Sequence, residues 1–587
     1  MTELISPSQI AKAIKLDRFG RIGTASGWLL MHLLGMHKIN RIYEEVQDLQ
    51  GLDFINAILD QLNIKLEIPE EDLKRIPKNG PFITVSNHPL GGLDGVLLLK
   101  IILEQRPDYK VLSSFILKNI PQLQNYLIEL KTKEDKQISG LKTALTYLAE
   151  GHGLGLFPAG EVSTYKDGKL VVDKTWDEKA LKLIYKAEVP IIPIYFHGRN
   201  SRLFYLLSKI HPKLRTAKLP SEAISDMKKT IKVRIGKPIT PKMQAGFANQ
   251  NLLGEFIRKK TYILAKTFEP RDLKERIKIK PKQAEKPVIA PVPVDKLKED
   301  IQRITDKNDQ MFEKNEYVGF LSDAKDIPHL LREIGRLREI TFREVGEGTG
   351  EEIDLDKYDK YYKHLVLWDK KENKVVGAYR MGLGREIFDK YGIKGFYLSE
   401  LFTFDSELYD MMSKSIEMGR AFIVKDYQQK PFPLFLLWRG IIHTTLRYPD
   451  HEYLIGPVSI SNKFSNFSKS LMIEFMKSYF YDPYTAQYVR PNKAFKVRLK
   501  EEDKAFIFDT ANENLTKFDK IIDELEPENL KVPVLLKKYI KQNARLIAFN
   551  VDPNFNNAID GLMYIKISDL PEETVKPVLE EFEKQFE

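Results

Sequence analysis

The residues whose types and spacing are best suited to catalysis lie in VSNHPLGGLDG, residues 85–95. The apolar run at 82–86 predicts a strand and a helical pattern begins near Asp94, so His88 is expected at a strand end, on a glycine-rich turn. A histidine in such a place can take a proton from an alcohol, while an aspartate on the same turn fixes its tautomer. The glycines at 91, 92 and 95 allow the backbone to approach a substrate closely. A purely structural hydrogen bond between His88 and Asp94 is the alternative.

A second group of polar residues lies within apolar segments in the second half of the chain. It comprises Arg338, Arg343, Asp356, Asp359, Arg380, Glu400, Glu417 and Arg420. Taken singly, each of these residues fits a surface ion pair. The segment EMGR at 417–420 is expected to precede a strand at 420–424.

Strand and helix patterns alternate before residue 280 and should position the first group. Apolar runs predict strands at 82–86, 110–115, 154–158 and 191–196, and periodic patterns predict helices from 94, at 141–150 and at 178–187. Such alternation is typical of an α/β sheet covered by helices. At 231–235, three apolar residues alternate with Lys232 and Arg234, which predicts a strand with both charges facing outward.

The second half of the chain predicts a separate α+β domain. Helices are expected at 328–342, 408–418 and 434–446, and strands at 362–368, 375–381 and 420–424. The expected fold class of the whole chain is therefore α/β and α+β, with one layered α/β domain and one mixed-sheet domain.

A proline-rich segment, KIKPKQAEKPVIAPVPVD, separates the two halves and has almost no periodicity. Such a segment is typical of a semi-extended linker. We therefore divide the chain into an N-terminal helical segment at 1–80, a first domain at 81–276, a linker at 277–300 and a second domain at 301–587.

The composition limits the chemistry. The 587 residues are 43% hydrophobic, which fits several packed domains. The absence of cysteine excludes disulfides, thiolate catalysis and thiolate-bound zinc, and we expect no metal site. The start MTELISPSQI lacks the pattern of a secretory signal, so we expect the chain to stay in the cytoplasm.

The positive charge is concentrated in one stretch. The formal net charge is +10, and residues 191–280 contain 21 basic and 6 acidic residues. A solvated face is the usual meaning of such a stretch, and an anionic membrane, an acidic protein or nucleic acid are the other partners it would suit. Aromatic residues do not interleave with these cations as in a nucleic-acid-binding module, so we expect no nucleic acid.

The most apolar early stretch is GWLLMHLLGM, residues 27–36. It is shorter than the roughly 20 residues that span a bilayer. Trp28 and the leucines, followed by the basic residues His37, Lys38 and Arg41, are typical of an amphipathic helix at a membrane surface. An ordinary core helix is the alternative.

The first half of the chain resembles the glycerolipid acyltransferases, also called lysophospholipid acyltransferases, over about residues 83–240. Asn87-His88 with Asp94, FPAGEVST at 157–164 and VPIIPIY at 189–195 carry the resemblance. It implies transfer of an acyl group from a thioester to a hydroxyl, with His88 as the base and Asp94 orienting it. The residues that this resemblance assigns to the acceptor side are Asn87, Gly160, Glu161 and Ser163.

Two features depart from that family. Five residues rather than four separate His88 from Asp94, so the glycine turn must absorb the additional residue. Glu161 stands where the family usually supplies an arginine for an acceptor phosphate. Because a carboxylate repels a phosphate and attracts an ammonium, Glu161 favours an acceptor with an amine head group. The alternative is that Glu161 is a turn residue facing water.

The second half, over about residues 325–570, resembles the acyl-homoserine-lactone synthase branch of the GNAT superfamily. It is more similar to those relatives that N-acylate ornithine from acyl-acyl carrier protein. The segments EMGR at 417–420, LWRGI at 437–441, YLIGPVSI at 453–460 and VPVLLKKY at 532–539 carry this resemblance.

This second resemblance implies that an amine attacks a thioester and passes its proton to a carboxylate, with Glu417 as the first candidate and Glu400 as the second. Arg380 and Arg420 are expected to pair with these acids or to hold the carboxylate of the amino acid. Asp356 and Asp359 are further candidate binding residues. The segment RMGLGR at 380–385 is superficially similar to a pyrophosphate loop, but it follows an early strand, which favours a carrier protein over coenzyme A.

The two halves together resemble the bifunctional ornithine-lipid synthases. The resemblance implies that the second domain joins a 3-hydroxyacyl chain to the α-amine of ornithine, and that the first domain then esterifies the 3-hydroxyl of this lyso lipid. The expected co-substrate is acyl-acyl carrier protein or acyl-CoA, with no other cofactor. The expected partners are the carrier protein, the amino acid, the lyso aminolipid and the anionic inner face of the cytoplasmic membrane.

Several alternatives remain open at this point. The amino acid could instead be glycine, lysine or a serine-glycine head group. The first domain could be a conventional lysophosphatidate acyltransferase beside an accessory GNAT-like domain. The chain could also be a basic membrane-binding or nucleic-acid-binding protein without enzymatic activity.

Overall fold

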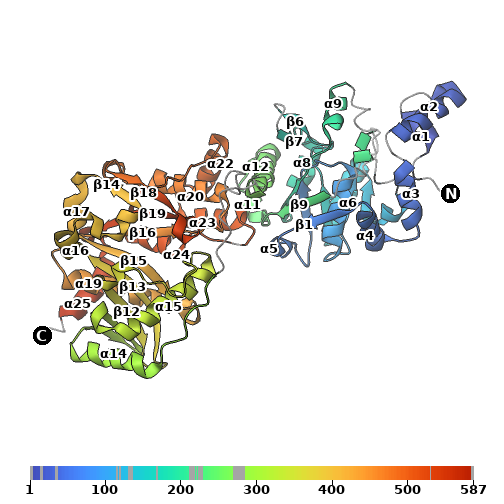
Figure 1. Ribbon diagram of the computed structural model, residues 1–587. Helices are drawn as coiled ribbons and strands as arrows, with labels where there is room; N and C mark the ends of the chain where they lie inside the picture. Colours follow the sequence, from blue (N-terminus) through green and yellow to red (C-terminus); the bar gives the residue numbers. More distant parts are fainter. Residues whose placement is uncertain are drawn as a thin grey trace. The chain divides into compact units, whose positions relative to one another are not determined.

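The computed structural model describes most of the chain and divides it into two compact units (Figure 1). The N-terminal unit comprises Met1–Glu269 with Pro527–Asn529, and the C-terminal unit comprises Pro270–Glu526 with Leu530–Glu587. The described residues are 4, 6–13, 17–33, 37–113, 117, 120–129, 137–166, 170–210, 218–219, 221–222, 229–268, 285–528 and 530–583.

A seven-stranded sheet forms the centre of the N-terminal unit. Its order is β1 (Ile64–Glu67), β9 (Lys229–Ile235), β8 (Ile191–His197), β2 (Phe82–Ser86), β5 (Gly153–Leu156), β3 (Lys110–Ser113) and β4 (Leu127–Glu129). All neighbouring strands are parallel except β8 and β9. Every residue of β2 is buried, as expected of a central parallel strand covered on both faces.

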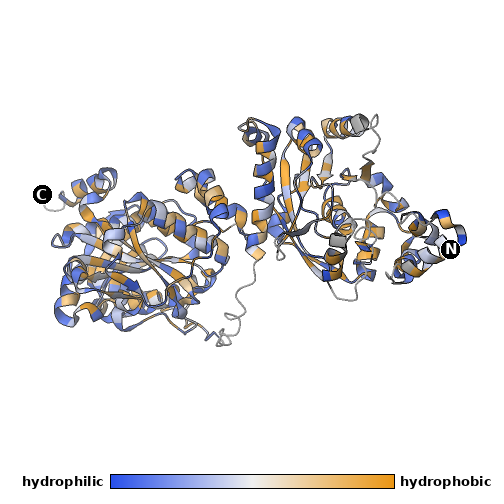
Figure 2. Ribbon diagram, turned by 90° about the horizontal axis from the view of Figure 1, so that it is seen from above, coloured by the Kyte–Doolittle hydropathy of each residue, from blue (hydrophilic) through white to orange (hydrophobic). Residues whose placement is uncertain are grey.

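Helices cover both faces of this sheet. Helices α4 (Gly51–Gln61) and α6 (Gly92–Leu103) enclose one core with Phe82 and Ile194. Helices α7 (Gln137–Ala149), α8 (Glu178–Ala187) and α12 (Gln250–Ile263) enclose the other core with Ile83 and Leu154. Figure 2 shows the apolar residues concentrated on the strands between these helices. The predicted α/β layering is confirmed.

Shorter elements complete the N-terminal unit. They are α1 (Pro7–Ala13), α2 (Gly20–Leu33), α3 (His37–Val46), α5 (Glu70–Leu73), η3 (Pro121–Tyr126), β6 (Thr164–Lys166), β7 (Leu170–Val172), α9 (Arg202–Ile210), α11 (Pro241–Gln244) and η4 (Leu264–Phe268). Strands β6 and β7 form a small antiparallel hairpin after the FPAGEVS segment. Residues 114–115 of the strand predicted at 110–115, and residues 34–36 of the apolar stretch, lie outside the described residues.

An eight-stranded mixed sheet forms the centre of the C-terminal unit. Its order is β10 (Gln310–Lys314), β11 (Tyr317–Asp323), β12 (Lys363–Asp369), β13 (Lys374–Leu383), β15 (Ser415–Ile423), β16 (Tyr453–Ile460), β19 (Ala558–Lys566) and β18 (Arg545–Asp552). Only β15 and β16 are parallel neighbours among these strands. The predicted mixed sheet is therefore confirmed.

Helices lie on both faces of the first strands of this sheet. Val366 of β12 belongs to the core under α14 (Val294–Asp306) and α15 (Pro328–Val345). The neighbouring Leu365 lies on the opposite face, against Gly440 of α19 (Pro433–Arg447). Helix α14 begins inside the interval assigned to the linker, and Ile289 before it donates a backbone hydrogen bond to Glu352 at 3.1 Å.

The remaining elements of the C-terminal unit are short or peripheral to the sheet. They are η6 (Lys357–Lys360), α16 (Gly384–Tyr391), η8 (Tyr397–Glu400), β14 (Phe402–Phe404), α17 (Tyr409–Ser413), α18 (Lys425–Gln428), α20 (Asn466–Tyr479), α21 (Pro483–Ala486), β17 (Val489–Pro491), α22 (Glu501–Ala511), α23 (Leu515–Leu525), α24 (Val534–Lys541), η10 (Pro553–Phe555) and α25 (Glu572–Glu583).

The helix predicted at 408–418 is wrong in its second half. Helix α17 stops at Ser413, and Glu417 and Arg420 both lie within strand β15 rather than before it. Ile416 and Met418 are buried in the sheet, and this tertiary burial overrides the helical spacing of the apolar residues. The correction places Glu417 on a rigid central strand.

The outward charges predicted for 231–235 are also partly wrong. Arg234 of β9 is completely buried, and its Nε donates a hydrogen bond to Asp72 Oδ2 at 2.7 Å. Asp72, on α5, also accepts a hydrogen bond from the backbone of Ile235 at 2.9 Å and pairs with Arg75. Helix α5 covers this face of the strand, so the alternation of charge did not mark a solvent-facing side.

We expect Asp72→Ala to destabilise the N-terminal unit by about 3–5 kcal/mol, because it leaves Arg234 buried without its carboxylate. Hydrogen exchange of the β8 and β9 amides in the full chain measures this loss. The control is Glu67→Ala, which removes the exposed pair of Glu67 with Lys232 and should cost less than about 1 kcal/mol. Equal exchange in the two variants would contradict the structural role of the buried pair.

Candidate active sites

His88 stands at the carboxyl end of β2 and contacts Asp94 in the first turn of α6. Its Nδ1 lies 3.0 Å from Asp94 Oδ2, and the same oxygen accepts a hydrogen bond from the backbone of Leu90 at 2.8 Å. Gly91 adopts a φ of +73°, a left-handed conformation that few other residues tolerate. The glycine turn thus absorbs the additional residue between His88 and Asp94.

The environments of His88 and Asp94 differ, and the difference bears on which nitrogen of His88 carries the proton. The side chain of Asp94 is fully buried, whereas that of His88 is 18% exposed. Burial raises the pKa of Asp94, while the contacts with His88 and with the backbone of Leu90 oppose this rise. When Nδ1 of His88 carries the proton shared with Asp94, Nε2 is left as an acceptor. This arrangement is compatible with the general base that the sequence analysis predicts.

A second carboxylate, Asp173, holds the backbone of the catalytic turn. Its Oδ1 accepts hydrogen bonds from the backbone of His88 at 3.1 Å and from Ser163 Oγ at 2.5 Å. Ser163 also donates its backbone N–H to the carbonyl of His88 at 2.8 Å. Ser163 is buried and engaged with Asp173, so its hydroxyl supports the turn. The sequence analysis missed Asp173, since no motif distinguishes it from other aspartates.

Asn87 pins the end of β2 to β8. Its side chain accepts a hydrogen bond from the backbone N–H of Phe196 at 2.7 Å and donates one to the carbonyl of Phe196 at 3.0 Å. Asn87 is buried, so the structure places it behind the site as a positioning residue. Asn200 holds the residue after His88, because its Nδ2 donates a hydrogen bond to the carbonyl of Pro89 at 3.0 Å.

The FPAGEVS segment borders the open side of the histidine. The ring of Phe157 lies 4.5 Å from that of His88, centre to centre. Gly160 is exposed and has a φ of +65°. Glu161 is partly exposed, and its Oε1 pairs with Lys174 Nζ at 2.8 Å. Glu161 therefore does attract an ammonium group, in this case one from the chain itself.

In the C-terminal unit, Glu417 is a buried carboxyl group on β15. Its Oε2 accepts a hydrogen bond from the hydroxyl of Tyr362 at 2.6 Å, and its Oε1 accepts one from the backbone of Leu398 at 3.1 Å. Burial raises the pKa of Glu417 to about 7, against the opposing effects of Tyr362 and Arg380. A carboxyl group with this pKa exchanges protons readily near neutral pH, as a general base requires.

Arg380 is buried beside Glu417 and balances two aspartates. Its Nη1 donates to Asp356 Oδ1 at 2.6 Å and to Asp359 Oδ2 at 3.3 Å. Burial raises the pKa of Asp359, but Arg338 and Arg380 lower it below its usual value. The guanidinium of Arg380 also lies within 5.6 Å of three tyrosine rings, those of Tyr358, Tyr362 and Tyr397.

Arg420 lies further along β15 in a strained conformation. Its φ is +51°, which costs a side-chain-bearing residue about 1–3 kcal/mol and is often found at functional sites. Its Nε lies 3.2 Å from Asp354 Oδ2, and its Nη1 donates to the hydroxyl of Tyr397 at 3.3 Å. The contact of Nη2 with Asp356 is long, at 3.5 Å. The structure thus brings Arg380, Arg420, Asp356 and Asp359 together, whereas the sequence analysis named Glu417 and Glu400 as the acids that the two arginines would pair with.

Glu400 lies at the edge of this group. Its Oε1 accepts a hydrogen bond from the hydroxyl of Tyr358 at 2.8 Å and pairs with Lys357 at 3.0 Å. Its side chain is 45% exposed, so water reaches the carboxylate directly. Of the two carboxylates considered as base, Glu417 is buried and Glu400 is partly exposed.

Further carboxylates lie near Arg420 that the sequence did not single out. Burial and the neighbouring Asp552 raise the pKa of Asp560 to about 7. Burial raises the pKa of Glu347 to about 7 as well. Glu347 acts on Asp560, while Asp354, Asp552 and Asp560 all interact with Arg420, so its surroundings hold an excess of carboxyl groups. Among the described residues, no group of His, Asp and Glu side chains has the arrangement of a metal site.

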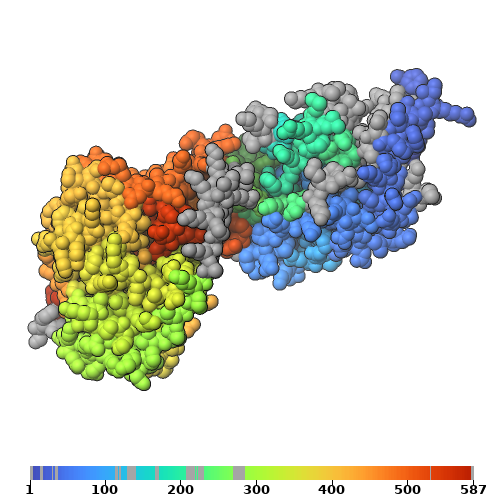
Figure 3. Space-filling view, viewed as in Figure 1, coloured from blue at the N-terminus to red at the C-terminus, as the bar shows by residue number. Residues whose placement is uncertain are grey.

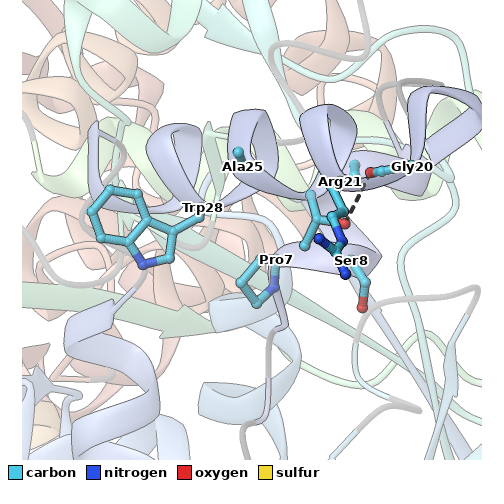
Figure 4. A pocket seen from close by; sticks show the side chains of 8 residues that line it. Pro7, Ser8, Gly20, Arg21, Ala25 and Trp28 are labelled. Carbon is cyan, nitrogen blue, oxygen red and sulfur yellow. Dashed lines mark hydrogen bonds between the residues drawn. The ribbon is translucent and has the colours of Figure 1, made fainter.

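A groove of about 640 Å³ lies away from both sites, between α1 and α2 (Figure 4). Pro7, Arg21 and Trp28 are among its lining residues. None of the candidate site residues of either unit lines this groove, so its size does not mark a catalytic centre.

Comparison with known proteins finds a different family in each half of the chain. The acyltransferase family matches residues 10–270, and the acetyltransferase (GNAT) domain family matches residues 337–438. A glycine N(alpha)-acyltransferase from Bacteroides thetaiotaomicron is 28% identical over 282 residues, which are 46% of this chain and 81% of that protein. A lyso-glycine lipid O-acyltransferase from the same organism is 31% identical over 219 residues, which are 36% of this chain and 79% of that protein.

One solved structure, the 1-acyl-sn-glycerophosphate acyltransferase PlsC from Thermotoga maritima, is 18% identical and covers 44% of this chain and 90% of that one. Its TM-score is 0.25, which carries no weight for fold or function.

The two sites and the two matching families define a bifunctional acyltransferase. The chain belongs to the family of acyltransferases that includes the lyso-glycine lipid O-acyltransferases, and it carries a GNAT domain in addition. The resemblances of the first half to acyltransferases and of the second half to GNAT enzymes are confirmed. Ornithine and the carrier protein as substrates, and the catalytic roles of the named residues, stay predictions.

We expect Tyr362→Phe to shift the acid limb of the pH profile of amine acylation to higher pH. The Tyr362 hydroxyl stabilises ionised Glu417 and lowers its pKa, so its removal raises that pKa further. A hydrogen bond to a charged group contributes about 1.5–3 kcal/mol, which corresponds to a shift of about one pH unit or more. The measurement is kcat/KM against pH. A shift to lower pH would exclude Glu417 as the titrating base.

Proposed function

We propose that the chain makes an N-acyl amino-acid lipid in two steps. The C-terminal unit N-acylates an amino acid with a 3-hydroxyacyl chain, and the N-terminal unit then O-acylates the hydroxyl of that product. The observation that carries the proposal is that one chain holds two different candidate bases, the His88–Asp94 pair and the buried carboxyl group of Glu417. The product of one unit is then the acceptor of the other.

In the O-acyl transfer, Nε2 of His88 removes the proton of the 3-hydroxyl as its oxygen attacks the thioester carbonyl. Asp94 stabilises the resulting imidazolium through the 3.0 Å contact at Nδ1. When the tetrahedral intermediate collapses, the C–S bond breaks and the thiolate takes the proton from His88. The ester and a free thiol are the products, and His88 returns to its starting state.

In the N-acyl transfer, an amine of the amino acid attacks the thioester carbonyl and gives up a proton. Glu417 accepts it, through the Tyr362 hydroxyl or a water molecule because the carboxyl group is buried. Arg420 suits the carboxylate of the amino acid, since its contact with Asp356 is long and a closer anion would displace it. When the tetrahedral intermediate collapses, the C–S bond breaks and the thiolate takes up the proton that Glu417 accepted, so the amide and a free thiol are the products.

The parting of β15 and β16 supports a long thioester donor in this unit. Residues Ser415–Glu417 of β15 pair with Tyr453–Ile455 of β16. Beyond these residues β15 stays paired with β13, and β16 stays paired with β19, but β15 and β16 no longer pair with each other. Their facing edges present backbone groups that an amide-containing arm can pair with. The connection from β15 to α19, residues 424–432, contains no glycine, which favours a carrier-protein arm over the pyrophosphate of coenzyme A.

Two amino acids are candidates for the acceptor, each on a separate ground. The relatives with 28% and 31% identity are named for glycine and glycine lipid, which favours glycine. The excess of carboxyl groups around Arg420, including Asp552 and Asp560, favours an amino acid with a second ammonium group such as ornithine.

The proposal includes a peripheral contact of the N-terminal unit with an anionic membrane. Helix α2 exposes Trp28 and Leu29, whose side chains are 52% and 55% accessible. Side chains of this kind enter the interface of a bilayer. In the part of the chain that the structure describes, no helix is long and apolar enough to cross a membrane.

The test supplies the full chain with 3-hydroxyacyl and acyl carrier proteins, labelled glycine or ornithine, and vesicles, and separates the lipids. His88→Ala should lower O-acylation about a hundredfold to ten-thousandfold, so that the monoacyl lipid accumulates. Glu417→Ala should abolish that monoacyl lipid. His152→Ala is the matched control, because His152 also contacts an aspartate, Asp108, at 3.3 Å, and it should leave both steps unchanged.

Two outcomes would contradict the proposal. Diacyl lipid at the normal rate in His88→Ala would remove the first site from the reaction. Loss of the monoacyl lipid in that variant, with the protein still folded, would mean that the roles of the units are exchanged. Acylation of added lysophosphatidate but of no amino-acid lipid would instead favour a conventional lysophosphatidate acyltransferase.

A further inference from the structure

Helix α9 carries an exposed apolar face that follows two exposed arginines. Leu203 and Leu206 are 51% and 56% accessible and lie one helical turn apart, so they share a face. Arg199 and Arg202 are also exposed, just before and at the start of the helix. Figure 3 shows the blue-green atoms of α9 at the surface of the N-terminal unit.

The opposite face of α9 is anchored near His88. Phe204 and Tyr205 are buried in a small apolar cluster with Val162 and Leu219. A Cβ atom on Gly91 of the catalytic turn would lie only 2.7 Å from Leu219 and 3.3 Å from Val162, so this cluster packs directly against the turn.

The segment before α9 ties the helix to the same turn. Two hydrogen bonds fix Asn200. Its Nδ2 donates to the carbonyl of Pro89 at 3.0 Å, and its backbone N–H donates to the hydroxyl of Tyr205 at 3.2 Å. Pro89 follows His88 directly in the chain. The exposed face of α9 is therefore held by packing and hydrogen bonds at a fixed place relative to the catalytic histidine.

We propose that Leu203 and Leu206 form a second membrane contact, distinct from α2, which holds the His88 site at the surface of an anionic bilayer. The inference rests on the proposed function, in which the acceptor hydroxyl belongs to a lipid. Such an acceptor has to reach His88 with its acyl chain still largely in the bilayer, because exposing each CH₂ group to water costs about 0.8 kcal/mol. A contact beside the catalytic turn shortens that path.

Charge complementarity selects an anionic bilayer as the occupant. Arg199 and Arg202 precede the leucines at the start of the helix, and residues 191–280 contain 21 basic residues against 6 acidic ones. Apolar side chains bordered by cations are the pattern of a helix lying in the headgroup region, where each cation adds attraction to anionic lipid.

The test compares binding of the full chain to vesicles of phosphatidylcholine with and without phosphatidylglycerol. The double variant Leu203→Asp/Leu206→Asp should bind the anionic vesicles at least about tenfold more weakly, since two insertions are lost and two charges repel the surface. Leu252→Asp is the matched control, because Leu252 is 49% exposed on α12 of the same unit, and it should bind as the unmodified chain does. Arg199→Glu/Arg202→Glu should weaken binding only to the anionic vesicles.

Activity provides a second measurement. The leucine double variant should lose O-acyl transfer to a long-chain acceptor in vesicles but keep it with a short-chain, water-soluble acceptor, which also shows that the variant is folded. Unchanged vesicle binding in this variant would overturn the inference. So would normal binding with a raised KM for the carrier protein, because α9 would then dock that protein instead.

Failure of the proposed function gives a different result. If the unmodified chain transfers no acyl group to either acceptor, the function is wrong, and the vesicle comparison between the leucine variant and Leu252→Asp still decides whether α9 contacts the membrane.

Discussion

The hydrogen bond between His88 and Asp94 is the constraint on which the N-terminal unit depends. It requires a histidine at the end of one strand and an aspartate in the next helix to meet across a turn that contains a left-handed Gly91. A turn of this kind is soft when isolated, so the surrounding residues have to fix it. Asn87 joins it to β8, and Asp173 holds the backbone of His88 itself. The parallel sheet thus works mainly as a rigid support for one short segment.

The C-terminal unit has a different constraint, because the side chains of its candidate site are ionisable and mostly buried. Removing a charge from water costs several kcal/mol unless a partner of opposite sign is close. Arg380 is accordingly surrounded by Asp356, Asp359 and aromatic rings, and Arg420 has Asp354. For Glu417, the hydrogen bonds from Tyr362 and Leu398 and the charge of Arg380 offset the effect of burial only in part, so its pKa rises to about 7. Balanced neighbours therefore leave one carboxyl group poised to accept a proton.

Much of this could be predicted from the sequence, because the central strands are continuous apolar runs and the catalytic motif is local. The motif made His88 and Asp94 a candidate pair although five residues rather than four separate them, and their side chains do meet, at 3.0 Å. What could not be predicted depends on tertiary burial. Arg234 follows the alternation of an exposed strand but is covered by α5, and Glu417 follows a helical spacing but lies in β15. Asp173 is far from His88 in sequence, and only the fold brings it to the turn.

The different surroundings of His88 and Glu417 suit the two acceptors of the proposed reactions, an alcohol and an amino acid. An alcohol gives up its proton only as its oxygen attacks, so its base has to lie beside the substrate, and His88 is accordingly partly exposed. An amino acid arrives as an ammonium ion and needs to lose a proton before it can attack. A buried carboxyl group with a pKa of about 7, such as Glu417, accepts that proton more readily than an exposed one and can release it again to solvent. The same logic explains why Glu400, which is exposed to water, is a weaker candidate than Glu417.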